Sequence, residues 1–298
     1  MDSPTFPNIP PIEQSFSKES SAMSDDTSHP IATARAWLEE SAALMITVGA
    51  GMGVDAGLPD FRGPEGLWRV FPGLKKRGMQ LMDIATPHWF DEDPALAWGF
   101  YGQRLLSYCS AQPHRGHAVL RAWSNRKPSW LVTSNVDGLL QKAGWPDACV
   151  WEMHGSIHRW QCSELCCEDR WPARMEELTF DRASGLASRW PHCPHCGAVA
   201  RPNIMMFGDG FWVANGMAAA ERAFRDFVAT HSDGILVVEL GAGQDISTIR
   251  DLSEWLNLCH GARLLRINPQ QEEDDGSLSR FCHLPLGAAA ALEAIGMP

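Results

Sequence analysis

The stretch Ala43-Leu-Met-Ile-Thr-Val-Gly-Ala-Gly51 decides the fold. Its first six residues form a short, continuous apolar run that is partly β-branched, and the run stops abruptly at Gly49. A strand that is buried on both faces of a parallel sheet has this pattern where it enters a tight turn. The stretch therefore predicts a central parallel strand followed by a glycine-rich loop.

Three later segments repeat this pattern, at residues 130–133, 234–240 and 263–267. Helical spacing of apolar residues separates them, at residues 31–38, 96–108, 117–123 and 216–227. Alternating strands and helices predict right-handed crossovers and an open α/β sheet, which binds ligands beyond the carboxyl ends of its strands. We expect four loops to converge there: Gly49-Ala-Gly51, Ser134-Asn-Val-Asp137, Gly241-Ala-Gly243 and Asn268.

The chain divides by composition into a leader and a folded body. Residues 1–30 hold five Pro and seven Ser with almost no apolar periodicity, which predicts a disordered leader, and Met23 is an alternative start. Residues 31–298 are expected to form one catalytic domain. Its parts are a Rossmann-like large domain (31–65, 111–156 and 206–298), a helical module (66–110) and an inserted zinc module (157–205) that is rich in Cys, Pro, His and Trp.

Composition excludes several classes of protein. The 298 residues are 45% hydrophobic, which excludes collagen, a disordered tail protein and a disulfide mini-scaffold. The formal net charge of −11 argues against direct nucleic-acid binding and against anionic membranes. No export signal or membrane span is visible, so the expected location is the cytoplasm. The oligomeric state cannot be inferred from the sequence.

Five of the nine cysteines lie between positions 162 and 196. Cys193-Pro-His-Cys196 is a C-x2-C knuckle, and Cys162 and Cys166 supply a looser second pair. Four thiolates form a closed tetrahedral Zn²⁺ site that leaves no position for substrate, so we expect a structural zinc. Cys167 is a spare thiol that could replace Cys166, while His192 and His195 are less favoured ligands.

The glycine loop continues as Met52-Gly53-Val-Asp-Ala-Gly57-Leu-Pro-Asp60-Phe61-Arg62 and ends at Gly66-Leu-Trp68. With it, the chain resembles the sirtuin family of NAD-dependent protein lysine deacylases over roughly residues 35–295. The motifs that carry the resemblance follow in the family's order: Gly49 to Trp68, Thr133-Ser-Asn-Val-Asp137, His154-Gly155, the four cysteines, Arg201-Pro202, Phe207-Gly-Asp209 and Ile267-Asn268.

The resemblance implies a mechanism and a set of NAD ligands. In this family nicotinamide leaves the ribose, the acyl oxygen of an acylated lysine captures the cationic carbon, and a histidine acts as base; His154 matches that histidine. Asn135 and Asp137 match catalytic positions near the nicotinamide ribose. Further matches to cofactor-binding positions are Gly49, Ala50, Gly51, Gly53, Asp60 (carboxamide), Phe61 (ring over the ribose carbon), Arg62 (phosphates), Ser134, Gly241, Ala242, Gly243 and Asn268 (adenosine ribose).

Some positions depart from the family pattern. Ser134 replaces the usual Gln and Gly53 the usual Ser, so both side chains near the cofactor are shorter. Gly241-Ala-Gly243 replaces a loop with hydroxyl donors, one of which Gln244 could replace. Phe207 and Gly208 are expected to bind substrate, but the strand that pairs with the peptide lacks the usual Glu and Pro. These changes leave NAD binding expected and put peptide specificity in question.

Trp98-Gly-Phe-Tyr101-Gly-Gln-Arg104 resembles the pattern of the sirtuin class that removes succinyl and malonyl groups. On a helix, Tyr101 and Arg104 share a face and could hold an acyl carboxylate together. An amphipathic helix that buries Trp98 and Tyr101 and exposes Arg104 explains the pattern equally well.

Three functions remain open. The first is an NAD-dependent lysine deacylase, that is, a deacetylase and possibly a desuccinylase, which acts on acylated-lysine proteins and transfers the acyl group to ADP-ribose. The second is an ADP-ribosyltransferase or NAD hydrolase that uses the same NAD crevice, which Ser134, Gly53 and the altered peptide strand favour. The third is a non-catalytic NAD-binding module, against which the intact His154 and Asp137 argue.

Overall fold

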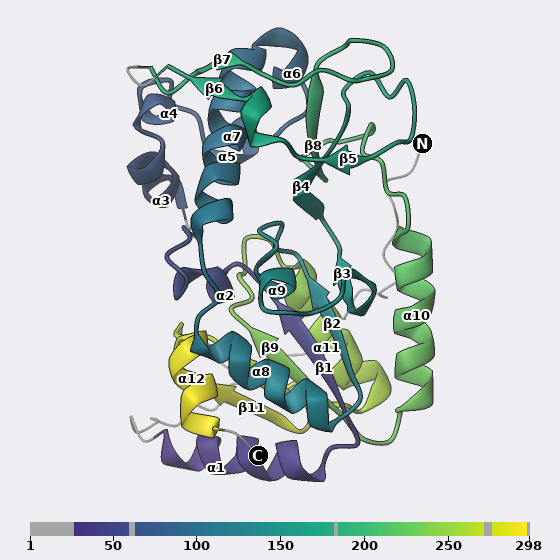
Figure 1. Cartoon of the computed structure of the whole chain (residues 1–298). Coiled ribbons are helices and arrows are strands. Elements are labelled where there is room, and N and C mark those ends of the chain that lie inside the picture. The colour runs from purple at the N-terminus through teal and green to yellow at the C-terminus, as the bar shows by residue number, and fades with distance from the viewer. Residues whose placement is uncertain (1–26, 60–62, 182–183, 271–275, 297–298) are drawn as a thin grey trace. The chain divides into compact units, whose positions relative to one another are not determined.

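The computed structural model describes residues 27–59, 63–181, 184–270 and 276–296 (Figure 1). These residues form two compact units. The first unit takes the described parts of 1–52, 115–132 and 223–298, and the second takes those of 53–114 and 133–222. Most of the sequence-predicted leader lies outside the described residues, and the domain boundaries given above stay a prediction.

The six-stranded sheet has the order β11-β10-β9-β1-β2-β3. Pairing is parallel between β1 and β9, between β9 and β10, and between β10 and β11. Every residue of β1 and β9 is buried, so both faces of these strands are covered. The strands are β1 (Ala43–Val48), β2 (Ser129–Thr133), β3 (Val150–Glu152), β9 (Ile235–Leu240), β10 (Arg263–Ile267) and β11 (Phe281–Leu284).

The helices of the first unit cover this sheet. Helix α11 (Thr248–His260) packs on β1, β9 and β10, while α12 (Ala288–Ile295) packs on α8 (Arg115–Arg126) and on α1 (Ser28–Glu40) (Figure 1). Helix α10 (Met217–Thr230) precedes β9. The α/β fold class and the predicted strands and helices are confirmed. Among the described residues, none of the helices has the length and apolar character needed to cross a membrane.

A buried ion pair lies inside the sheet. Glu239 of β9 and Arg266 of β10 stand opposite each other in the register, with side chains 1% and 4% exposed. The Arg266 guanidinium donates to both Glu239 oxygens, at 2.6 and 3.1 Å, and to Glu254 at 2.8 Å. Each charge is therefore neutralised and hydrogen-bonded, as burial requires.

The second unit joins helices to short antiparallel sheets. Strand β4 (Gly155–Cys162) pairs with β5 (Trp171–Pro172) and β8 (Ala200–Ile204), and β6 (Thr179–Phe180) pairs with β7 (Ala187–Arg189). The predicted helical character of residues 66–110 is confirmed. The helices are α2 (Gly51–Val54, which begins in the first unit), α3 (Gly63–Val70), α4 (Pro72–Lys76), α5 (Leu81–Ile84), α6 (Trp89–Glu92), α7 (Pro94–Ser110), α9 (Leu139–Lys142) and two 3-10 turns, η1 (Asp147–Cys149) and η2 (Met175–Glu177).

Aromatic side chains fix α7 in the core of the second unit. Trp98 is fully buried, and its Nε1 donates to the carbonyl of Ala200 in β8 at 2.9 Å. Its ring meets the ring of Trp160 in β4 edge to face, with 5.4 Å between centroids. Large buried rings contribute most of the apolar area of a core, so these contacts set the position of α7 and of the side chains that it carries.

Candidate active site

The loops that follow β1 and β9 touch through their backbones in the first unit. The amide of Gly51 donates to the carbonyl of Gly241 at 2.9 Å. A Cβ added at Gly51 would lie 2.6 Å from the Cα of Gly241, and one added at Gly49 would lie 2.7 Å from the Gly241 oxygen. Glycine is therefore required at Gly49 and Gly51 for packing alone. The predicted convergence of these two loops is confirmed.

Gly243 differs from these glycines. Nothing among the described residues lies within 4 Å of where its Cβ would be, so protein packing does not explain the missing side chain. The side-chain amide of Asn268 holds this loop, because its Nδ2 donates to the carbonyl of Ala242 at 2.8 Å, and Asn268 is fully buried. The backbone at Gly243 carries no side chain and is held in place by a hydrogen bond. A pyrophosphate can approach such a backbone closely, so the loop fits NAD. Ala50 is exposed beside it.

Three predicted cofactor ligands, Asp60, Phe61 and Arg62, lie outside the described residues. Gly53 lies in α2, and a Cβ added there would stand 3.7 Å from the Asp137 carboxylate and 3.4 Å from Leu58. The family's Ser at this position would therefore bring a hydroxyl beside Asp137.

The loop after β2 carries Ser134, Asn135 and Asp137. The hydroxyl of Thr133 accepts a hydrogen bond from the Asn135 amide at 3.0 Å, and the Asp137 carboxylate accepts one from the Leu139 amide at 2.8 Å. Asp137 is buried, and burial raises the pKa of its carboxyl, although the Leu139 amide opposes the shift. Asp137 therefore fixes the start of α9 in addition to any role toward a ligand.

His154 lies in the turn between β3 and β4. Gly155 has a φ of +77°, and a Cβ there would lie 2.1 Å from the Asn203 carbonyl oxygen, so glycine must follow the histidine. The amide of Met205 donates to the His154 carbonyl at 2.9 Å. Burial of the imidazole lowers the pKa of His154 to about 4, against a smaller opposite effect of its hydrogen bond to the Ser134 backbone. The ring is neutral at pH 7 and can accept a proton.

The two tyrosines of the chain both pack against Arg104 on α7. The guanidinium carbon lies 5.4 Å from each ring centroid, and Nε and one terminal nitrogen donate to the Tyr108 hydroxyl at 3.1 and 2.9 Å. Tyr101 is 1% exposed, and burial raises its pKa to about 12, so its phenol stays protonated. Arg104 is thus held by rings instead of extending into solvent.

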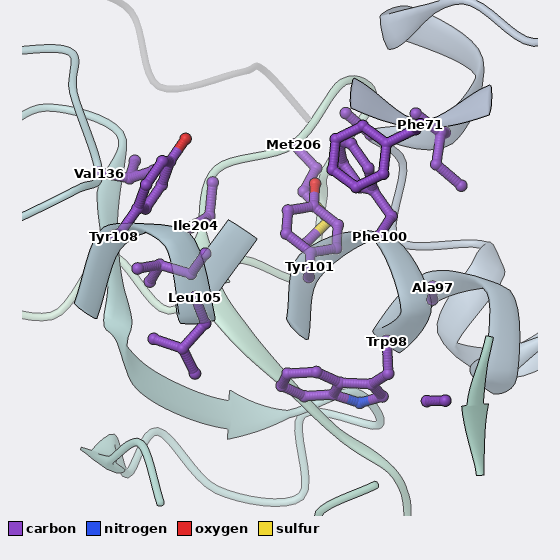
Figure 2. Close-up of a cluster of buried hydrophobic side chains, with 14 of the residues drawn as sticks. Phe71, Ala97, Trp98, Phe100, Tyr101, Leu105, Tyr108, Val136, Ile204 and Met206 are labelled. Atoms are coloured by element: carbon purple, nitrogen blue, oxygen red, sulfur yellow. The ribbon is translucent and has the colours of Figure 1, made fainter. Parts of the chain in front are cut away.

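Tyr108 is a residue of this cluster that the sequence analysis missed. It stands four residues after Arg104 on the same helix, a spacing that places side chains on one face. Figure 2 shows Tyr108 beside Val136 and Tyr101 beside Met206, both from the buried cluster of this unit. The scarcity of tyrosine in the chain, combined with this spacing, was the available signal.

Phe207 and Gly208 form a turn, and the strand that the resemblance implied for residues 207–212 is absent from this described segment. Gly208 has a φ of +66°, and the Asp209 carboxylate accepts the amides of Met206 and Phe211 at 3.2 and 3.1 Å. Arg201 donates to both Asp209 oxygens, at 3.0 and 2.7 Å, with both side chains fully buried. Asp209 is therefore used to hold the turn, which prevents an extended backbone.

The four predicted zinc ligands come together in the second unit. The Sγ atoms of Cys162, Cys166, Cys193 and Cys196 all lie within 4.8 Å of one another. The distances Cys162–Cys196 and Cys166–Cys193 are both 3.6 Å. A tetrahedral ion with Zn–S bonds of about 2.3 Å places its sulfurs about 3.8 Å apart, so this donor set fits Zn²⁺. Cys167 and His195 lie outside this set, and belong to a separate group with Asp169.

The family model for the Sir2 family matches residues 49–238, which is more than half of the chain. A protein from Ralstonia nicotianae named "NAD-dependent protein deacylase" is 32% identical over 86% of this chain and 92% of its own length. "NAD-dependent protein deacylase 1" from Pseudomonas aeruginosa is 32% identical, over 76% of this chain and 83% of its own.

Solved structures share the fold. A Sir2 homologue in complex with NAD matches with a TM-score of 0.66 at 21% identity, over 94% of this chain and 95% of its own. A Sir2 protein with a p53 peptide and NAD⁺ matches with a TM-score of 0.65 at 22% identity, over 87% and 94%. The solved structures show that the fold is the same. The family model and the relatives at 32% identity show common ancestry. The chain belongs to the Sir2 family.

Proposed function

We propose that the protein is an NAD-dependent protein lysine deacylase. The observation that carries the proposal is His154, which is neutral at pH 7 and hydrogen-bonded to the Ser134 backbone. A base near a ribose hydroxyl must be unprotonated at the working pH, and burial achieves this for His154. The names of the Ralstonia and Pseudomonas relatives support the same activity.

The residues divide between holding NAD and acting on it. Bound NAD supplies a ribose carbon that can exchange nicotinamide for an acyl oxygen. The bare backbone at Gly241–Gly243 would hold the phosphates together with Arg62, and Asn268 would hold the adenosine ribose. Asp60 would bind the carboxamide, and the ring of Phe61 would cover the ribose carbon. His154 would accept the ribose proton, with Asn135 and Asp137 beside it. Cys162, Cys166, Cys193 and Cys196 would hold a zinc ion that stabilises their module without taking part in the reaction.

Mass spectrometry of peptides tests this proposal. Full-length protein is incubated with acetyl-lysine and succinyl-lysine peptides of one sequence, with and without NAD. We expect a deacylated peptide and acyl-ADP-ribose only where NAD is present. Absence of deacylated product from every acyl peptide, while an authentic sirtuin yields it in parallel, would refute the assignment.

A second candidate is acyl-independent attack on NAD, as an ADP-ribosyltransferase or NAD hydrolase. It is favoured by Gly53, which lacks the hydroxyl that the family's Ser would bring beside Asp137, and by the turn at Phe207 and Gly208. Where fewer protein groups surround bound NAD, water or another nucleophile can reach its ribose carbon. The assay above separates the two, because this activity releases nicotinamide without any acyl peptide.

For the acyl group, the cluster on α7 favours a carboxylate at its end. Arg104 is oriented by Tyr108 and lies against Tyr101, so a guanidinium and a phenol could bind one carboxylate together. Succinyl-lysine is the substrate that follows from this arrangement. A cytoplasmic location is a further prediction. It is supported by the nine cysteines, all within the described residues, which form no disulfide and so suit a reducing compartment.

A further inference from the structure

Three further metal-ligating side chains gather next to the four-cysteine cluster. The Sγ of Cys167, a carboxylate oxygen of Asp169 and a ring nitrogen of His195 all lie within 4.8 Å of one another. His195 Nε2 and Asp169 Oδ2 are 2.9 Å apart. This set shares no residue with the four cysteines.

In each of two dipeptides, one side chain belongs to the four-cysteine set and its neighbour belongs to the second set. Cys166 joins the four cysteines while Cys167 joins the second set, and Cys196 joins the four cysteines while His195 joins the second set. His195 and Cys196 lie in the turn of the knuckle, and Cys166 lies at a bend. Leu165, with a φ of +49°, turns the chain just before Cys166. The second set therefore lies directly beside the first, because each of the two dipeptides contributes to both.

The chemistry of the second set suits a divalent transition metal. Thiolate, carboxylate and imidazole are all zinc ligands, and together the first two supply the negative charge that neutralises one divalent ion. Four thiolates around one Zn²⁺ keep an excess of negative charge, which attracts a second cation nearby. Because the side chains of His195 and Asp169 are 51% and 66% exposed, solvent competes for this ion.

We propose that Cys167, Asp169 and His195 form a second site for a divalent zinc-class ion, separate from the four-cysteine site. Three protein ligands leave a coordination position for water, and the ion binds more weakly than the zinc held by four thiolates. It ties the segment around Cys167 to the knuckle at His195. This proposal does not depend on the deacylase assignment.

Metal content of the full-length protein tests the site. The zinc-loaded protein is dialysed against a series of buffered free Zn²⁺ concentrations, and bound zinc per chain is measured by atomic emission. We expect one ion that is retained at the lowest free zinc and a second that is bound at higher concentrations. One ion per chain at every concentration would overturn the proposal.

Variants show which residues hold the second ion. Cys167→Ser and His195→Ala should lose the second ion and keep the first, with unchanged thermal unfolding at low free zinc. Cys259→Ser, which removes another exposed thiol, should keep both ions. Retention of two ions in both Cys167→Ser and His195→Ala would mean adventitious binding. Loss of the tight ion from Cys167→Ser would place Cys167 in the first site, and either result overturns the proposal.

Discussion

At the scale of single residues, the protonation state of His154 follows from its surroundings. An imidazole in water has a pKa of about 6.5 and is partly charged at neutral pH. Burial disfavours the charged form and lowers the pKa of His154 to about 4. A base works when it is unprotonated, so the reaction should lose rate only as the pH falls toward about 4.

Replacing His154 with Ala tests its role. We expect NAD binding measured by calorimetry to persist and turnover to fall by about 10²–10⁴-fold, the usual contribution of a positioned base. For the native protein, kcat/KM should show no acid limb near pH 6.5. His29→Ala, which removes an exposed histidine, is the control. An unchanged rate in His154→Ala would remove His154 as the base.

We expect the face of α7 that carries Arg104 to set the acyl preference. Arg104→Met should lower kcat/KM for a succinyl-lysine peptide and spare the matching acetyl-lysine peptide. Tyr108→Phe keeps the ring but removes the acceptor of two hydrogen bonds from the guanidinium. Hydrogen bonds to a charged group are worth about 1.5–3 kcal/mol, so the succinyl rate should fall about 10-fold or more.

The exposed Leu106 on the same helix supplies the control, since Leu106→Met should change neither rate. Equal losses on both peptides in Arg104→Met and Tyr108→Phe would show that the face is only structural.

At the scale of elements, glycine allows the loops after β1 and β9 to touch. Gly51→Ala places a methyl group 2.6 Å from the Gly241 Cα, and neither backbone can yield cheaply. Overpacking of this kind costs about 1–3 kcal/mol, which urea unfolding measures. Gly243→Ala is the matched control, because its methyl group meets nothing among the described residues and should leave stability unchanged. Equal stability of the two variants would show that the loops do not pack this way.

The ion pair between β9 and β10 makes a second prediction at this scale. Arg266→Met leaves Glu239 buried without its main partner, and the loss of one partner of a buried pair costs about 3–5 kcal/mol. Arg263 of the same strand pairs with the exposed Glu40, so Arg263→Met should cost less than about 1 kcal/mol. Similar free energies of unfolding in the two variants would contradict the structure.

At the scale of the whole molecule, local patterns predicted the strands and part of the site. Apolar runs that end in glycine marked β1 and β9, and short cysteine spacings marked the four-thiolate cluster. Partners that are distant in the sequence left no such pattern. Glu239 and Arg266 meet only because β9 and β10 are neighbours in the sheet, and Arg201 meets Asp209 only because a turn returns to β8.

Residues 207–212 show the limit of a resemblance. Family motifs implied a strand at residues 207–212, but Asp209 in place of the family's Glu gathers the amides of Met206 and Phe211 and keeps a turn. The second metal-ligand set was hidden for a different reason. Cys167 and His195 each stand next to a stronger ligand in the sequence, and only the fold brings them together with Asp169.

The coupling of nicotinamide release to deacylation tests the central claim most directly. Nicotinamide, acyl-ADP-ribose and deacylated peptide are quantified in one reaction of the full-length protein with NAD, and nicotinamide is also quantified without acyl peptide. We predict equal amounts of the three products and no nicotinamide release in the absence of acyl peptide. Nicotinamide and free ADP-ribose formed at the same rate without acyl peptide would contradict a deacylase and identify an NAD hydrolase.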